Sequence, residues 1–512
     1  MSVSDISNQI LDDLRKLEEN LPLSRSCFEL PSTKKKLAND LARYLFPIIT
    51  HKNGTDREIN SWYKGLKSKL KKIYTEQAEA RRTTKNYGSC KMTPYHKARS
   101  SKIDYEQMKL APLSEQITRP SAMPVEIAPI EELRPFYDRL MQNSEAIGIK
   151  SDSIGSYEQY KRGAYYTDGR IDLCKQVVGP PHIAELMQSF RNNPYVEHFL
   201  LGNNIIGPTG AREIASFIRN GSRIKTWYLA GNEFDAAGMA DIADALKNST
   251  SCTQLWLKRN PIMTEGAKAI AEMLKHNKHI EVLDLDNTGI MDEGAIAIFE
   301  ALKYNNSIKS IYLDANGLTE KTSHVIADYF KHKNTLERLS ISINRLGDSV
   351  SLFQNTSLKS LVIGGNRIEL SGLKSILQYA ARSNLQVLDV GYYKSTADMG
   401  ELPNSFGDEG AVEIAKFIEL NTPLEYLSFH NSHITDLTII EKAMEKNTNL
   451  IYVTAEQYNI SSKKITERCL VNYQAKLDSQ AKFDKGTYSE YVRKLKHGPD
   501  IWVIDSIYRN NM

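Results

Sequence analysis

The 512-residue sequence predicts an α/β solenoid, in which a curved parallel β-sheet lines the inside, helices cover the outside and helical segments flank both ends. Two observations predict it: an apolar pattern that returns every 28 residues, and a change of apolar spacing within each copy. A fixed period of this length is typical of solenoids, because one unit cannot bury its apolar face without neighbours. Five consecutive steps of 28 residues join Val196, Ile224, Cys252, Ile280, Ile308 and Leu336.

The first half of each copy predicts a short strand. In the third copy Leu255 and Leu257 flank Trp256, and alternation with period two is typical of a β-strand. The second half predicts a helix, because apolar residues such as Ile270 and Leu274 recur at helical spacing. Helices are wider than the distance between neighbouring strands, so the stack should curve with the sheet on its inner face.

An asparagine follows the strand in most copies. Its side chain both donates and accepts hydrogen bonds, so it can satisfy backbone groups where the strand ends inside the stack. These residues are Asn204, Asn232, Asn260, Asn316, Asn344 and Asn366. Thr288, Ser432, Tyr393 and Tyr458 take the equivalent position in four other copies, where we expect this hydrogen-bond ladder to be weaker.

Two later steps depart from the period. The step from Leu336 to Leu358 is only 22 residues, which predicts that the helix of this copy is reduced to a turn. The step from Leu385 to Leu424 is 39 residues, and residues 394–406 are predicted to form an inserted loop. Insertions in solenoids usually lie on one face, often the binding face.

The repeats resemble those of the leucine-rich repeat proteins, and in particular the ribonuclease-inhibitor-like subtype with long repeats. The strand pattern above carries the resemblance, together with a Gly-Ala-x-x-Ile start of the helical half. That start occurs at Gly210, Gly266, Gly294 and Gly410. Bacterial or effector-type members of the family fall within the resemblance. It implies the fold and says little of function, because this architecture serves many unrelated roles.

Composition and pattern divide the chain into five segments. They are a basic helical N-terminal region (1–110), a proline-rich linker (111–135), an N-terminal cap (136–167), a repeat domain of about 11 repeats (168–460) and a helical C-terminal cap (461–512). Caps are expected because the end repeats otherwise expose their apolar faces. A helix is also expected near residues 130–143.

A cytoplasmic location is predicted, or delivery into a host cytosol if the protein is an effector. No basic segment followed by an apolar core opens the sequence, and no apolar run reaches membrane-spanning length. The five cysteines are isolated and lack the spacing of metal ligands. Isolated thiols of this kind fit a reducing compartment.

Charge is distributed unevenly. Residues 31–110 contain 19 Lys and Arg against 7 Asp and Glu, a net of +12, so the rest of a chain with a total of +4 carries −8. The segment could bind nucleic acid or an anionic surface, or it could be a solvated run of charge. The candidate anion-binding residues are Arg81, Arg82, Lys85, Lys91 and Lys97.

The repeat frame places large aromatic and charged side chains together on the concave face. Aromatic rings with a rim of both charge signs are typical of protein-binding surfaces. The predicted partner-binding residues are Tyr228, Trp256, Lys258, Arg259, Asp284, Asp286, Tyr312 and Asp314. The alternative is that Trp256 and Tyr228 are shielded by the cap or by each other.

No catalytic constellation is found. Asp284, Asp286 and Asp314 resemble a metal or acid–base cluster, but no histidine or nucleophile completes it, so no metal, cofactor or catalytic residue is predicted. We therefore expect a recognition or scaffold protein that binds a protein partner and is not an enzyme. An effector or ubiquitin-ligase adaptor, in which the solenoid selects the target, is the alternative. The oligomeric state is left open.

Overall fold

The computed structural model describes residues 126–354, 357–392, 402–457, 460–477 and 483–510. All of them belong to one compact unit, Met92–Met512. The basic region and its five candidate residues, Arg81, Arg82, Lys85, Lys91 and Lys97, lie outside the described residues. Residues 393–401, which include most of the predicted insertion, also lie outside them.

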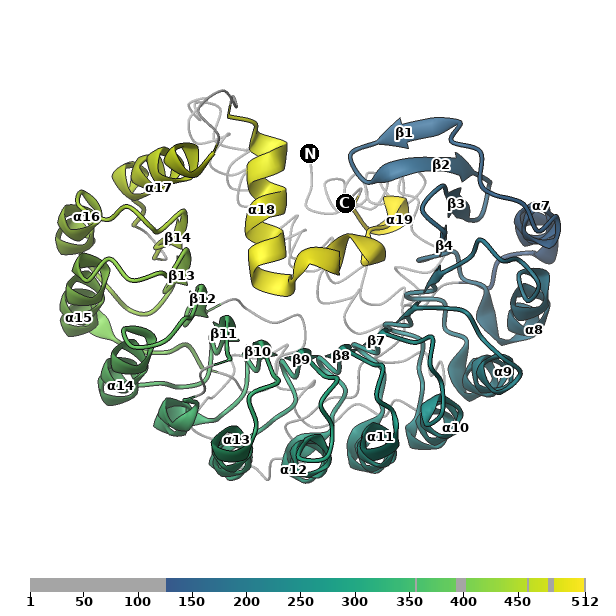
Figure 1. The fold of residues 1–512 in the computed structure, drawn as a ribbon, viewed down its shortest axis with the longest axis horizontal. Coiled ribbons are helices and arrows are strands. Elements are labelled where there is room, and N and C mark those ends of the chain that lie inside the picture. The colour runs from purple at the N-terminus through teal and green to yellow at the C-terminus, as the bar shows by residue number, and fades with distance from the viewer. Residues whose placement is uncertain (1–125, 355–356, 393–401, 458–459, 478–482, 511–512) are drawn as a thin grey trace, which may run out of the picture. The chain divides into compact units, whose positions relative to one another are not determined.

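The described residues form a fourteen-stranded sheet whose strands follow each other in chain order (Figure 1). The first three pairings, among β1 to β4, are antiparallel, and every later pairing is parallel. The strands ahead of the parallel part are β1 (Lys150–Asp152), β2 (Gly155–Gln159) and β3 (Ala164–Tyr166). The parallel strands are β4 (Arg170–Asp172), β5 (His198–Leu200), β6 (Thr226–Tyr228), β7 (Gln254–Trp256), β8 (Val282–Asp284), β9 (Ser310–Tyr312), β10 (Arg338–Ser340), β11 (Ser360–Val362), β12 (Val387–Asp389), β13 (Tyr426–Ser428) and β14 (Tyr452–Thr454).

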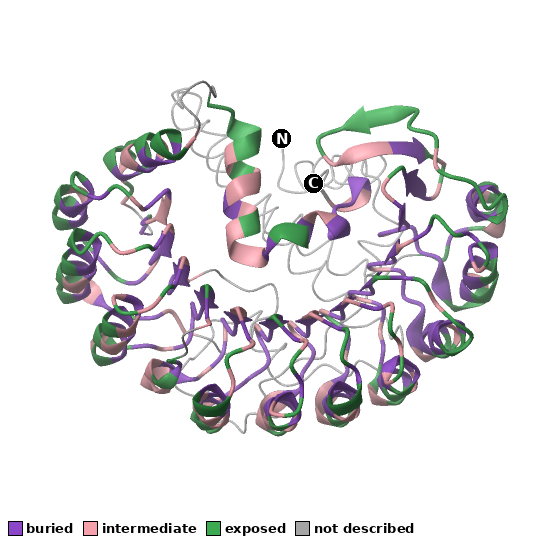
Figure 2. Ribbon diagram, in the orientation of Figure 1, coloured by how far each residue is buried: buried purple, intermediate pink, exposed green. Residues whose placement is uncertain are grey.

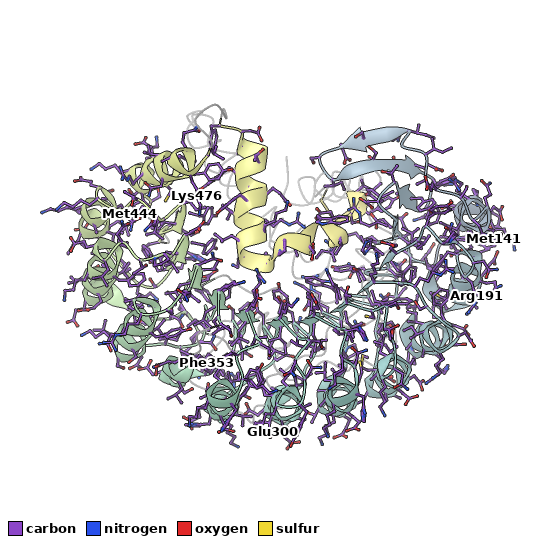
Figure 3. The ribbon with its side chains drawn as sticks, viewed as in Figure 1. Met141, Arg191, Glu300, Phe353, Met444 and Lys476 are labelled. Carbon is purple, nitrogen blue, oxygen red and sulfur yellow. The ribbon has the colours of Figure 1, made fainter. Side chains whose placement is uncertain are left out.

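Helices cover the outer side of the parallel strands. They are α8 (Gly179–Ser189), α9 (Gly207–Arg219), α10 (Ala236–Leu246), α11 (Met263–His276), α12 (Met291–Leu302), α13 (Glu320–His332), the 3-10 helix η1 (Gly347–Leu352), α14 (Leu370–Ala380), α15 (Gly407–Glu419) and α16 (Thr438–Met444). The apolar side chains between strands and helices form one continuous core. Polar residues such as Glu300 face outward from the helices (Figures 2 and 3). This arrangement confirms the predicted α/β solenoid. The predicted loss of the helix in the 22-residue step is confirmed too, because η1 is a single short 3-10 segment.

The asparagine ladder runs through the interior of the stack. Asn232 is fully buried, and its Nδ2 donates to the carbonyl oxygens of Leu229 in its own copy and Leu201 in the previous one, at 3.0 and 2.8 Å. Its Oδ1 accepts from the backbone N–H of Asn204 at 3.0 Å. Since the carboxamide satisfies strand ends in two copies at once, each asparagine ties neighbouring repeats together.

Two predicted ladder positions, Tyr393 and Tyr458, lie outside the described residues. After β12 the ladder contacts are made by Asn404, whose Oδ1 accepts from the backbone N–H groups of Asn366 and Ile368, each at 2.9 Å. The extra residues of this copy therefore come before its ladder residue, and the repeat pattern resumes at Asn404. After β14 the ladder contacts are made by Gln457, whose side chain is one methylene longer than that of asparagine and accepts from the backbone N–H of Ser432 and donates to the carbonyl oxygen of Phe429.

Thr288 and Ser432 do stand at ladder positions, as predicted. Thr288 Oγ1 donates to the carbonyl oxygen of Leu285 at 2.7 Å, and Ser432 Oγ donates to that of Phe429 at 2.6 Å. A hydroxyl has one donor where a carboxamide has two, so each residue bonds its own copy and not the previous one.

The two ends of the solenoid are closed differently. At the N-terminal end, helix α7 (Ile130–Met141) and strands β1–β3 pack against the first repeat. The predicted linker therefore ends at 129 and not at 135, because Pro135 lies within α7. At the other end, α17 (Lys463–Lys476) packs its Ile465 and Cys469 into the main core. Among the described residues, no helix has the length and apolarity needed to cross a membrane.

The last described residues do not extend the end cap. Helix α18 (Lys485–His497), the 3-10 helix η2 (Pro499–Ile504) and α19 (Ile507–Asn510) lie on the strand side of the repeats and are drawn in yellow in Figure 1. We call residues 485–510 the C-terminal segment. Gly498, at φ +101°, allows the sharp turn between α18 and η2, a conformation that side chains disfavour. Among the described residues of the predicted cap, 461–512, α17 covers the last repeat, whereas α18, η2 and α19 lie on the strand side.

Candidate binding site on the concave face

The predicted aromatic residues form one row across the sheet. Tyr228, Trp256, Asp284 and Tyr312 are the last residues of β6, β7, β8 and β9. In-register pairing places each beside the next, from Tyr228 and Trp256 through Trp256 and Asp284 to Asp284 and Tyr312. The strand register that the repeat predicts is therefore what assembles this row.

The rings of the row contact one another. Trp256 and Tyr312 stack with 5.5 Å between ring centroids, although β8 separates their strands. Strands two positions apart are about 9.6 Å apart, so both rings lean toward each other across the short side chain of Asp284. Tyr228 lies on the other side of Trp256, with centroids 6.5 Å apart.

The row is not exposed to solvent, and the expectation that it would be exposed is wrong. Trp256 is 5 % exposed and both tyrosines are 6 % exposed. They belong to an apolar cluster with Ile501, Val503 and Ile504 of the C-terminal segment. Shielding of Trp256 and Tyr228 was the alternative reading of the sequence, and the C-terminal segment provides it.

A cavity of about 500 Å³ lies between the row and the C-terminal segment. Six predicted residues line it from the strand side: Tyr228, Trp256, Lys258, Asp284, Asp286 and Tyr312. The C-terminal segment contributes Arg493, His497, Ile501, Ile504, Asp505 and Arg509. The site is therefore a partly filled groove between two parts of the chain, with rings at its base and charges of both signs in its walls.

Two predicted residues lie apart from the cavity lining. Arg259 is exposed in the turn after β7, where its backbone has a φ of +61°. Asp314 is half-buried, and its Oδ1 accepts from Ser340 Oγ and from the backbone N–H of Ser342, each at 2.7 Å. Asp314 therefore links the turns of two neighbouring copies. A role of Arg259 and Asp314 in partner binding stays a prediction.

The acidic residues are poorly neutralised. Burial raises the pKa of Asp284 well above its ordinary value, and the charge of Asp286 raises it further. Burial also raises the pKa of Asp286, although Lys258 Nζ lies 3.7 Å from its carboxylate and opposes the change. Burial and the charge of Asp286 raise the pKa of Asp314 to about 8. A basic group placed beside these buried carboxyl groups would stabilise their charged form and lower their pKa, so the site favours basic ligands.

The site suits binding better than catalysis. Among the described residues, no group of His, Cys, Asp and Glu side chains is arranged to hold a metal ion. Rings beside carboxylates can bind guanidinium and ammonium groups through cation–π contacts and charge. Arg509 of the C-terminal segment already makes such a contact, because its guanidinium carbon lies 4.2 Å from the centre of the Tyr228 ring.

Comparison with protein-family models gives one match, the Leucine Rich repeat, at residues 276–299 and 354–377. Both matched segments begin four residues before the first apolar residue of a copy, Ile280 or Leu358, so they share the frame of the strands and the asparagine ladder. The protein is a leucine-rich repeat protein. The predicted ribonuclease-inhibitor-like subtype stays a prediction.

No curated protein matches this leucine-rich repeat chain. Solved structures that resemble it include the Rad7 and Elc1 complex in yeast, with 15 % identity, 58 % of this chain and 71 % of that chain covered, and a TM-score of 0.39. An internalin (inlF) from Listeria monocytogenes has 13 % identity, coverage of 58 % and 88 %, and a TM-score of 0.32. Leiomodin-1 Actin-Binding Site 2 has 27 % identity, coverage of 25 % and 77 %, and a TM-score of 0.24.

The sequence prediction missed the contacts that hold the C-terminal segment on the leucine-rich repeats. Arg170 in β4 is 1 % exposed and donates from Nη1 to the carbonyl oxygen of Asp505 at 2.8 Å. At the other end, Lys496 Nζ lies 2.7 Å from buried Asp389. The available signal was the run Ile501–Ile504, which is too apolar for a solvated tail.

Proposed function

We propose that this leucine-rich repeat protein is a recognition scaffold that binds a protein partner on its concave face. One observation carries the proposal: this face already holds a folded piece of polypeptide, the C-terminal segment. The aromatic row buries aliphatic side chains of that segment, and Asp389 of the face pairs with Lys496 of the segment. A surface that binds a helix and a turn of its own chain has the chemistry to bind those of another protein.

The proposal includes a cytoplasmic location and assigns no reaction to the chain. The three described cysteines, Cys174, Cys252 and Cys469, are free and buried, and burial raises the pKa of each thiol. A buried thiol with a raised pKa behaves as a small apolar side chain and is a poor nucleophile.

The test compares the concave face with the outer helices in the full-length chain. Proteins captured from a cell extract are identified, purified and titrated against the wild type, Asp286→Lys and the control Glu300→Lys, which changes the same charge on outer helix α12. We expect Asp286→Lys to weaken binding at least about tenfold, as loss of a central contact does, and Glu300→Lys to leave it unchanged. Equal affinity for all three chains, or loss only with Glu300→Lys, would contradict the proposal.

The basic N-terminal region supports a second candidate function, binding of nucleic acid or an anionic surface. Its observation is the net charge of +12 over residues 31–110. The full-length chain should bind RNA, DNA or phosphatidylserine vesicles with an affinity that falls steeply as salt rises. Replacing Arg81, Arg82, Lys85, Lys91 and Lys97 together by Gln should remove most of that binding. Binding that does not depend on salt, or that survives the replacement, would exclude this role.

A further inference from the structure

The C-terminal segment contacts strands at both ends of the repeat domain. Near the last strands, Tyr491 Oη donates to Glu425 Oε2 and Tyr488 Oη donates to the carbonyl oxygen of Ile451, each at 2.7 Å. In the middle, Tyr312 Oη donates to the carbonyl oxygen of His497 at 3.0 Å. Side chains of the concave face therefore hold the segment along its length, although it adds no strand to the sheet.

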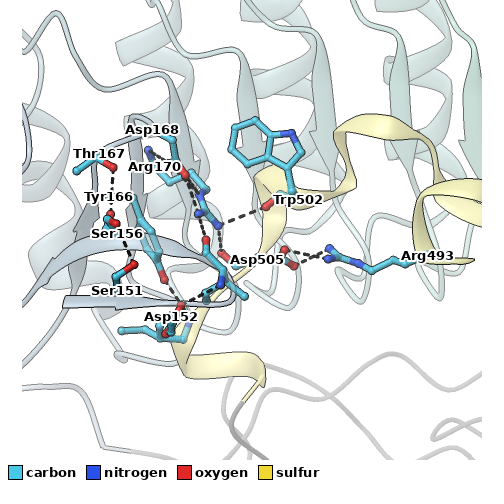
Figure 4. A network of polar contacts seen from close by, with 12 residues as sticks. Ser151, Asp152, Ser156, Tyr166, Thr167, Asp168, Arg170, Arg493, Trp502 and Asp505 are labelled. Atoms are coloured by element: carbon cyan, nitrogen blue, oxygen red, sulfur yellow. Dashed lines mark hydrogen bonds and ion pairs between the residues drawn. The ribbon is translucent and has the colours of Figure 1, made fainter. Parts of the chain in front are cut away.

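Arg170 holds the far end of the segment (Figure 4). Its guanidinium donates to the carbonyl oxygens of Trp502 and Asp505, at 3.3 and 2.8 Å, and pairs with Asp168 at 2.7 Å. The carboxylate of Asp505 is in turn paired with Arg493 at 2.5 Å. One arginine of the first repeat thus recognises the backbone of the turn, and an internal ion pair keeps that turn folded.

The apolar side chains of the segment lie outside the main core. The main core runs from α7 to Ile465 and Cys469 of α17 and includes no residue of 485–510. The segment instead forms three small clusters on the concave face, around Ile501, Ile507 and Val492. Because α17 already covers the last repeat, removal of the segment would expose these clusters and leave the repeat core intact.

The segment fits the groove incompletely. The cavity of about 500 Å³ remains beneath it, and Asp284 and Asp286 face that cavity. The Nε atom of Arg509, which lines the cavity, and the Nε atom of Arg338, which lies beside Gly498, are buried and make no hydrogen bond. Each buried polar atom that lacks a partner destabilises the contact, because it loses its bonds to water and gains none in exchange. The segment therefore binds the concave face less tightly than a fully packed segment of the same contact area would.

We propose that the C-terminal segment is an intramolecular ligand that occupies the concave face and must leave before a partner binds there. The proposal rests on the proposed function and adds its regulation. The partner competes with the segment and should resemble it. It should have a helix with a basic end, as at Lys496, followed by an aliphatic turn, as at Ile501 and Ile504. A partner that places a further basic group against Asp284 and Asp286 would fill the cavity better than the segment does.

The first test uses a fluorescent peptide of residues 485–510 as the probe. It is titrated against the full-length wild type and against Lys496→Glu/Ile504→Asp, which weakens docking and leaves every residue on the strand side of the cavity unchanged. We expect the peptide to bind the double variant at least about tenfold more tightly, because a site that is mostly occupied has a proportionally weaker apparent affinity. Equal binding to both chains, or binding to neither, would overturn the proposal.

A charge exchange provides the matched control. A peptide with Lys496→Glu should not bind the double variant, because its carboxylate would meet that of Asp389. The chain Asp389→Lys/Ile504→Asp, whose own Lys496 would be repelled by the new lysine, should bind this peptide and bind the natural one weakly. If both peptides bind both chains alike, the peptide binds elsewhere and the proposal fails.

A second measurement applies if the double variant does not fold. A site-specific protease sequence is inserted between Leu477 and Phe483 of the otherwise wild-type chain, which is then cut. We expect the labelled peptide to exchange with the cut segment while circular dichroism shows that the repeats stay folded. Unfolding on release, or no exchange at all, would show that the segment is a permanent part of the fold.

These outcomes separate the regulation from the function. A partner that binds the wild type and the double variant equally would refute occupancy by the segment and leave the scaffold function standing. Peptide exchange without any partner that depends on Asp286 would support the intramolecular ligand and refute the scaffold function.

Discussion

The asparagine ladder and the aromatic row use the same strands but depend on different distances along the chain. Ladder contacts such as those of Asn232 join residues 28 or 31 positions apart, and they recur in neighbouring copies. The contacts over the row join residues much farther apart, such as Tyr312 with His497, 185 positions away, and Arg170 with Asp505, 335 positions away. The ladder is thus repeated many times, whereas the covering of the row depends on one segment and can be lost as a unit.

The largest difference between the repeat core and the aromatic row should appear in the stability of two tryptophan variants, at Trp227 and Trp256. Trp227 is 1 % exposed in the main core, against the rings of Phe199 and Phe217, with centroids 5.4 and 6.0 Å away. Trp227→Ala should lower the free energy of unfolding by about 3–5 kcal/mol, as loss of a large core side chain does. Trp256→Ala should lower it by less, because that ring lies in the small cluster beneath the segment. Denaturant unfolding measures both, and a larger loss for Trp256→Ala would invert the assignment of the two faces.

The ladder should be the next most sensitive part. Asn232→Ala leaves the backbone N–H of Asn204 buried without its partner. It also removes one of the hydrogen bonds that the carbonyl oxygens of Leu229 and Leu201 accept, although Asn260 and Asn204 still donate to them. We expect a loss of about 2–4 kcal/mol in unfolding free energy, since each such group contributes about 1–3 kcal/mol and neighbours relax. Peptide binding to the concave face should not change. A variant as stable as the wild type would show that water replaces the carboxamide.

The dependence of stability on pH should come from the acidic residues of the concave face and not from the apolar core. The pKa of Asp314 is about 8 in the folded protein and 3.8 in its ordinary state, so between these values the folded protein holds a proton that the unfolded chain has released. Stability therefore falls as pH rises through this window. Asp314→Asn should raise the melting temperature by about 2 °C or more at pH 8 and by little at pH 4. The same gain at both pH values would show that the carboxylate does not titrate there.

The smallest effect is expected where the ladder is incomplete. Thr288→Asn adds the second donor that the other copies have, in reach of the carbonyl oxygen of Leu257 in the previous copy. We expect a gain of about 1 kcal/mol, the contribution of one hydrogen bond. Thr288→Val, which keeps the shape of threonine and removes its donor, is the control and should lose stability. If Thr288→Asn also loses stability, the threonine site is too narrow for a carboxamide.

Much of the site could be predicted because the repeat period determines the strand register. Once Trp256 and Asp284 are 28 residues apart in one frame, parallel pairing places them side by side, and six of the predicted residues line one cavity. The ladder contacts of Asn404 and Gln457 were missed because a fixed frame fails where an insertion or a longer side chain changes the ladder residue. Asn404 could have been found by searching for the next asparagine with an apolar residue two positions later, here Phe406.

The sequence by itself determined the solenoid, its concave row and the position of the shortened repeat, because these follow from contacts between neighbouring copies with a constant spacing. Only the tertiary structure decided that the row is covered. The pairing of Lys496 with Asp389 and the seating of the Trp502 and Asp505 backbone on Arg170 join segments without any periodic relation. A single long-range contact leaves no repeating pattern in the sequence. Forming it closes a long loop of chain, which costs conformational entropy, and only a good fit between the two surfaces in three dimensions offsets that cost.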